Sequence, residues 1–135
     1  MTWEAKTPEF GDIIRTKVSF YYHYGIFVDE NQVIQFGLPE NVSQPADTIH
    51  VLQTDVYRFL NGGELEVGVP EREERKKMRS AREIVEIAIG RMGEGGYDIL
   101  HNNCEHFVND CAFGAPHSSF LSDVRLKLRK KLNKA

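Results

Sequence analysis

The most informative stretch of the sequence is Asn102-Asn103-Cys104-Glu105-His106-Phe107-Val108, which places a cysteine where a helix is expected to begin. Asparagine is a favoured N-cap residue, and Gly114 followed by Pro116 is typical of a helix end. The spacing therefore predicts a helix from Cys104 to Phe113. Unpaired backbone N–H groups and the positive end of the helix dipole stabilise a thiolate in the first turn. This position is expected to lower the pKa of Cys104 and to favour a nucleophile.

A packing role for the same cysteine also fits the pattern. Cys104, Phe107, Val108 and Cys111 fall on one face of the expected helix. A free cysteine often behaves as a small buried apolar residue. The position on the helix leaves both interpretations open.

The composition predicts one globular domain, because 135 residues with 41% hydrophobic and 27% charged side chains suit a modest core. No apolar run reaches the ~18 residues of a membrane span, and the first residues lack the pattern of a signal peptide. Cys104 and Cys111 would lie ~10 Å apart along one helix, too far for a disulfide. Two free thiols are typical of a reducing compartment, so we expect a soluble, cytoplasmic protein.

Charge is distributed unevenly along the chain. The net charge is −3, but residues 122–135 carry +5, which leaves −8 for the rest. An acidic body argues against nucleic-acid binding, whereas the basic end suits an anionic surface. Apolar residues recur in this end at helical spacing: Leu121, Val124, Leu128 and Leu132. We expect residues 1–121 to form the domain and residues 122–135 to form an amphipathic tail or helix, which either touches a membrane or docks on its own domain.

Hydrophobic patterning predicts a sheet followed by helices. The expected strands are residues 11–15, 18–28, 33–36, 49–52 and 64–69. Pro70, the acidic residues after it and an apolar stripe predict one helix that the glycines at 93–96 end. The stripe comprises Met78, Ala81, Val85, Ala88 and Met92. This order predicts an α+β fold whose antiparallel sheet packs on the cysteine-bearing helix.

His23 is the best candidate for a base beside Cys104, because a strand holds its position more firmly than a loop would. His106 is two residues from Cys104 and so points to another side of the helix. The other histidines fall in expected loops: His50, His101 and His117. A metal site built from His101, Cys104 and His106 lacks recognised ligand spacing, so no cofactor or metal is expected.

Gln35 is expected to orient the imidazole of His23. A three-residue turn after Val28 would pair Val28 with Gln32 and Gly25 with Gln35, which places Gln35 on the face of His23. A two- or four-residue turn without a bulge would place it on the other face. Gln35 could equally be a polar strand residue with no such role.

These residues together resemble the lecithin retinol acyltransferase-like family, which includes the H-Ras-like suppressor phospholipases and acyltransferases. The resemblance covers residues 11–14, 23–28 and 97–114, and its most specific part is Asn103-Cys104-Glu105-His106-Phe107. Family members resemble circularly permuted papain-like and NlpC-type cysteine enzymes. The resemblance therefore implies a permuted papain-like domain.

By this resemblance, Cys104 is the nucleophile and His23 the general base of acyl transfer or hydrolysis on lipid esters through a thioester. The family usually has a second histidine where this chain has Gln35; a neutral amide can still accept the imidazole N–H and hold its tautomer. The backbone N–H of Cys104 is expected to stabilise the oxyanion, with Tyr21 as a hypothetical second donor and Asn103 as the supporting cap.

Two other functions fit the same residues. A cysteine amidase or peptidase would use the same Cys–His pair on an amide. A non-catalytic module would bind a lipid or a protein partner through the groove or the basic tail. The presence of Gln35 in place of a histidine keeps this second alternative open.

Overall fold

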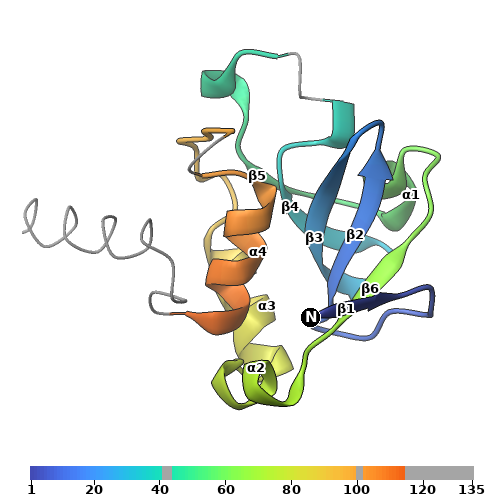
Figure 1. The fold of residues 1–135 in the computed structure, drawn as a ribbon. Coiled ribbons are helices and arrows are strands. Elements are labelled where there is room, and N and C mark those ends of the chain that lie inside the picture. The colour runs from blue at the N-terminus through green and yellow to red at the C-terminus, as the bar shows by residue number, and fades with distance from the viewer. Residues whose placement is uncertain (41–43, 100–101, 115–135) are drawn as a thin grey trace, which may run out of the picture.

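The computed structural model describes residues 1–40, 44–99 and 102–114 (Figure 1). Within them, six antiparallel strands form one sheet in the order β1-β6-β2-β3-β4-β5. The strands are β1 Thr2–Glu4, β2 Ile13–Val18, β3 Tyr21–Asp29, β4 Gln32–Phe36, β5 Val51–Thr54 and β6 Glu66–Val69. The helices are α1 Val56–Leu60, α2 Arg72–Lys77, α3 Ala81–Gly90 and α4 Cys104–Phe113, with a short 3-10 helix at Ala46–Thr48. The expected α+β class is confirmed.

The two faces of the sheet carry separate apolar clusters, because successive strand residues point to opposite sides. Ile26 and its neighbours pack with α3 and α4 in the larger cluster. Phe27 packs with Phe59 of α1 in the smaller one. Figure 1 accordingly shows α1 on the side of the sheet away from α4. Each fully buried large side chain contributes about 1.5–3 kcal/mol, so both faces help to hold the central strands in place.

The single strand expected over residues 18–28 is wrong at its start. β2 and β3 form a hairpin in which Val18 pairs with Tyr21, and the chain turns at Ser19 and Phe20. Ser19 has a φ of 59°, a left-handed conformation that suits the first position of a two-residue turn. The β-branched and aromatic residues continue through this turn, so the sequence carries no glycine or asparagine to mark it.

The return from β3 to β4 confirms one part of the expected register and corrects another. Gly25 pairs with Gln35, as expected. Gln32, however, pairs with Asp29 and not with Val28, because a bulge shifts the register near the end of β3. The turn is therefore two residues long. The bulge compensates for the shorter turn and keeps Gln35 on the same face.

The single helix expected from Pro70 to Met92 is wrong, because the structure has α2 and α3 with a break between them. Met78 ends α2 with an extended backbone, at φ −79° and ψ 139°. The hydroxyl of Ser80 then accepts a hydrogen bond from the backbone N–H of Glu83 at 3.2 Å and starts α3. The serine with a glutamate three residues later is a capping box, and this local signal outweighs the continuous apolar stripe.

Three elements had no counterpart in the sequence interpretation: β1, α1 and the 3-10 helix Ala46–Thr48. Helix α1 starts at the side chain of Asp55, which accepts from the backbone N–H of Arg58 at 2.8 Å. It ends at Asn61, whose φ is 46°. Its Phe59 is fully buried, so this five-residue helix covers the sheet face that α3 and α4 leave open. The short strand expected at residues 49–52 lies two residues further on, as β5.

Some expectations fall outside the described residues. These are the amphipathic tail at 122–135, its boundary after residue 121, and the loop positions of His101 and His117. Of the helices described, none is long and apolar enough to cross a membrane.

Candidate active site

Cys104 is the first residue of α4, as the sequence predicts. The side-chain oxygen of Asn103 accepts hydrogen bonds from the backbone N–H groups of Glu105 at 3.0 Å and His106 at 3.1 Å. The amide nitrogen of Asn103 donates to the carbonyl of Ile99 at 2.9 Å. Asn103 thus ties the start of the helix to the preceding loop and fixes the backbone of Cys104.

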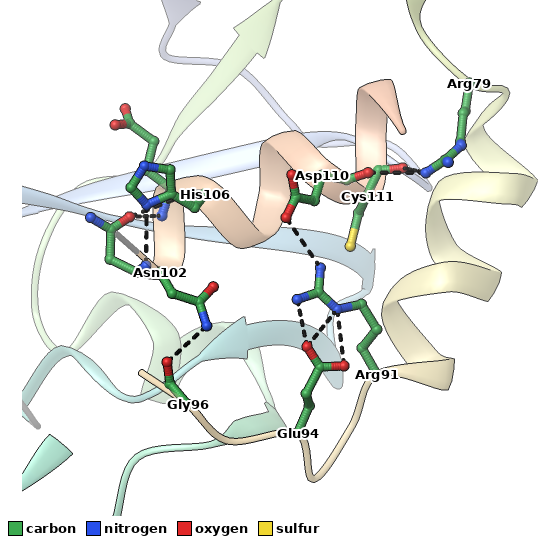
Figure 2. A network of polar contacts seen from close by, with 10 residues as sticks. Arg79, Arg91, Glu94, Gly96, Asn102, His106, Asp110 and Cys111 are labelled. Carbon is green, nitrogen blue, oxygen red and sulfur yellow. Dashed lines mark hydrogen bonds and ion pairs between the residues drawn. The ribbon is translucent and has the colours of Figure 1, made fainter. Parts of the chain in front are cut away.

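The loop before α4 is held by further polar contacts (Figure 2). Asn102 donates from its side-chain nitrogen to the carbonyl of Gly96 at 2.8 Å. The Nδ1 atom of His106 accepts from the backbone N–H of Asn103 at 3.2 Å. His106 therefore completes a capping box, a structural role.

Two arginines hold the far end of α4, and Figure 2 shows both. Arg79 donates from Nη1 to the carbonyls of Asp110 at 2.9 Å and Cys111 at 3.1 Å. Arg91 forms an ion pair with Glu94 at 2.7 Å and lies 3.8 Å from the carboxylate of Asp110. The last carbonyls of a helix lack the usual partner within the helix. The carbonyl of Asp110 already accepts from the backbone N–H of Gly114, so Arg79 adds a second donor there and supplies a donor to the carbonyl of Cys111. The helix that carries Cys104 is anchored at both ends.

His23 is buried on β3, with 3% of its surface exposed. Its Nε2 atom lies 2.7 Å from the amide oxygen of the fully buried Gln35. Its ring packs on the ring of Phe59, with the centroids 5.2 Å apart. The polar contact confirms that Gln35 faces His23, and the ring contact shows that α1, absent from the sequence interpretation, supports the imidazole.

A cavity of about 320 Å³ brings four of the expected site residues together, whereas Gln35 lies behind His23 and does not line it. Cys104, His23, Tyr21 and Asn103 all border it. The rest of its wall is mostly aromatic or apolar: Phe20, Tyr22, Tyr24, Phe36, Gly37, Leu38, Ile49, Tyr97, Ile99 and Glu105. Among the described residues, no hydrogen bond joins the thiol of Cys104 to the imidazole of His23.

Burial governs the proton affinities of the pair. It raises the pKa of the Cys104 thiol to about 11, although backbone N–H groups, that of Tyr24 first, oppose the rise. The expectation that the helix start lowers this pKa is therefore wrong, because burial destabilises the thiolate more than the backbone N–H groups at the helix start stabilise it. Burial also lowers the pKa of His23 to about 4, against a smaller opposing effect of Gln35. At neutral pH both groups are uncharged.

Two tyrosines lie close to the thiol. The hydroxyl of Tyr21 donates to the carbonyl of Pro39 at 2.9 Å, so Tyr21 borders the cavity with its proton already engaged. Burial, and then the proximity of Cys104 and Tyr21, raises the pKa of Tyr97 to about 12. Sequence reasoning assigned no role to Tyr97, and only its place seven residues before the cysteine could have suggested one.

The sequence profile of the family named lecithin retinol acyltransferase matches residues 6–117, most of the chain. The chain belongs to the lecithin retinol acyltransferase family. Its match includes β2, β3 and all of α4, the elements that carry His23 and Cys104.

Individual members of this family are similar to the chain at modest identity. Bovine lecithin retinol acyltransferase is 26% identical in an alignment 143 residues long, which includes 88% of this chain and 62% of the bovine protein. Human phospholipase A and acyltransferase 3 is 26% identical over 127 residues, which cover 87% of this chain and 78% of the human protein. The alignment thus spans less than two thirds of the bovine relative. The names of these two relatives are those of an acyltransferase and of a phospholipase and acyltransferase.

Proposed function

We propose that this chain transfers or hydrolyses acyl groups of lipid esters through a thioester on Cys104, with His23 as general base and Gln35 as the group that orients it. The observation that carries this proposal is the cavity that Cys104 and His23 border together, with its mostly apolar and aromatic wall. Lipid chains are apolar, so such a wall suits them better than it suits a peptide backbone. The names of the relatives support the same class of substrate.

The chemistry starts from two neutral groups. As Sγ of Cys104 attacks the ester carbonyl, its proton moves to Nδ1 of His23, the ring nitrogen not directed at Gln35. The tetrahedral oxyanion collapses, the C–O bond to the leaving alcohol breaks, and His23 returns the proton to that oxygen. Water, an alcohol or an amine then attacks the thioester and gives its proton to His23. The C–S bond breaks, and His23 returns the proton to Sγ of Cys104, which regenerates the thiol.

The oxyanion needs donors that meet it in the transition state. The backbone N–H of Cys104, at the start of α4, is one. Tyr21 is the proposed second donor, and it must leave the carbonyl of Pro39 to serve. If Tyr21→Phe turns over lipid at the rate of the unaltered chain, Tyr21 has no such role.

We further propose that the domain is a circularly permuted papain-like fold. A cysteine at the start of a helix, a histidine on an adjacent antiparallel sheet and an amide on the imidazole support this proposal.

The basic segment at residues 122–135 is proposed to give a cytoplasmic protein a reversible contact with anionic membranes. Removal of residues 122–135 should then weaken sedimentation with anionic vesicles but not with neutral ones.

The test is the intact mass of the chain after incubation with phospholipid vesicles and an acid quench. We expect an acyl-sized increase that Cys104→Ala and His23→Ala abolish. Cys111→Ala and His50→Ala are matched controls, since Cys111 lies in the core away from the cavity and His50 is exposed. An adduct that survives Cys104→Ala, or lipid turnover without His23, would overturn the proposal.

The alternatives give different results in the same experiment. Rapid alkylation of Cys104 without an acyl adduct, together with cleavage of a peptide or cell-wall substrate, would indicate the amidase. An inert thiol with retained vesicle binding would indicate the binding module. The raised pKa of Cys104 is the observation that supports this second alternative.

A further inference from the structure

A row of three hydrogen bonds starts at His23 on β3 and ends at Asp55, the residue that caps the start of α1. The Nε2 atom of His23 lies 2.7 Å from Oε1 of Gln35, and Nε2 of Gln35 donates to the hydroxyl of Thr54 at 2.6 Å. The hydroxyl of Thr54 donates in turn to the carbonyl of Asp55 at 2.9 Å. Thr54 ends β5 and pairs with Val33, so it lies diagonally across from Gln35.

The direction of this row is set at its outer end. A carbonyl oxygen only accepts, so the single proton of the Thr54 hydroxyl goes to Asp55. That hydroxyl can then only accept from Gln35, which turns the amide nitrogen toward Thr54 and the amide oxygen toward His23. An amide oxygen likewise only accepts, so Nε2 of His23 carries the imidazole proton. Nδ1 is left with a free lone pair.

We infer that Thr54 is a positioning residue that holds His23 in this tautomer by fixing the orientation of the Gln35 amide. This inference rests on the proposed function, in which Nδ1 must accept the thiol proton. A glutamine has nearly the same shape when its amide is turned by 180°, so its contact with His23 does not by itself select a tautomer. In the turned orientation the amide nitrogen would donate to Nε2, and Nδ1 would carry the proton.

The surroundings leave the amide few other partners. Gln35 is fully buried, so an amide N–H group of Gln35 without a partner would destabilise the folded chain. The carbonyl of Asp55 also accepts from the backbone N–H of Phe59 at 3.1 Å, so α1 fixes the direction in which this carbonyl points. The same helix therefore supports His23 twice, through the ring of Phe59 and through this row of hydrogen bonds.

Thr54→Val tests the inference with little change in side-chain shape. Without the hydroxyl, the amide nitrogen of Gln35 loses its acceptor and regains one only by turning toward His23. That turn leaves the amide oxygen unpaired, and proteins tolerate a buried unpaired oxygen more readily than a buried unpaired N–H group. We expect ¹⁵N-detected histidine NMR at neutral pH to show the Nε2–H tautomer of His23 in the unaltered chain and mainly the Nδ1–H tautomer in Thr54→Val. The lipid turnover number should fall roughly tenfold, the population change that about 1.4 kcal/mol produces.

Matched variants separate this role from a loss of packing. Thr54→Ser keeps the hydroxyl, so we expect it to keep the Nε2–H tautomer of His23 and the lipid turnover number of the unaltered chain. Thr2→Val changes a threonine of the edge strand β1, whose hydroxyl lies 3.5 Å from the carbonyl of Val69, and should alter neither. In a Gln35→Glu background the carboxylate only accepts, so Thr54→Val should no longer change the tautomer.

Several results would overturn the inference. An Nδ1–H tautomer in the unaltered chain refutes it without any variant, even if Thr54→Val does not fold. An unchanged Nε2–H tautomer in folded Thr54→Val also refutes it. The NMR measurement needs no substrate, so the expected tautomers in a chain that forms no thioester would refute the proposed function alone.

Discussion

Replacing His23 by glutamine removes the only buried imidazole among the described residues. The free energy of unfolding should then decrease less as the pH falls below 7. Burial lowers the pKa of His23 from 6.5 to about 4 in the folded chain. Between these values the unfolded chain binds a proton that the folded chain does not, so the free energy of unfolding decreases as the pH falls. The full effect below pH 4 is about 3 kcal/mol, of which about 2 kcal/mol is lost by pH 5.

The assay is urea denaturation of the unaltered chain and of His23→Gln at pH 8 and pH 5. Carboxylates titrate in both proteins, so the informative quantity is the difference between their two pH dependences. The unaltered chain should lose about 2 kcal/mol more than His23→Gln over this range. His50→Gln is the matched control, because His50 is exposed, and it should lose as much as the unaltered chain.

Equal losses in the unaltered chain and in His23→Gln would refute the reasoning. That result would mean that His23 accepts a proton as readily in the folded chain as in the unfolded one. The imidazole would then be hydrated or already paired with the thiolate of Cys104. The neutral resting pair of the proposed mechanism would have to be abandoned.

Three further predictions follow from the same contacts. In a Cys111→Ala background, alkylation of Cys104 should be slow at pH 7 and rise about tenfold per pH unit toward pH 11, since only the thiolate reacts; rapid labelling at pH 7 would contradict the raised pKa. Phe59→Ala should lower the free energy of unfolding by about 3–5 kcal/mol in urea, whereas Tyr57→Ala, at a position 91% exposed, should change it by less than about 0.5 kcal/mol. Gly25→Ala should cost about 1–3 kcal/mol, because the added Cβ would lie 2.8 Å from the ring of Phe59; an unchanged denaturation midpoint would show that the ring yields freely.

Local signals in the sequence were sufficient to predict α4. The asparagine caps and Gly114 predicted its bounds, because a helix end is satisfied by residues within a turn of it. The sheet face of Gln35 was also predicted, since hairpin register depends on a short turn and on side-chain alternation. The turn length itself was wrong, and the bulge that compensates for it carried no signal in the sequence.

Longer-range packing decided the rest. Ser80 breaks the long helix where α3 must pack on α4, and α1 forms because Phe59 fills the face of the sheet that α3 and α4 leave uncovered. The pKa of Cys104 was predicted in the wrong direction for the same reason. The sequence shows the helix dipole, a local property, whereas the burial that outweighs it arises only when α4 closes on the sheet.

The sequence by itself thus predicted a cysteine and a histidine that border one cavity, and the helix that presents the thiol. Only the tertiary structure decided how they are protonated and what holds them. Thr54 illustrates the division, since nothing in its sequence neighbourhood marks it. It meets Gln35 because β4 and β5 pair across the sheet, and its hydroxyl proton is directed by a helix that the sequence interpretation did not include.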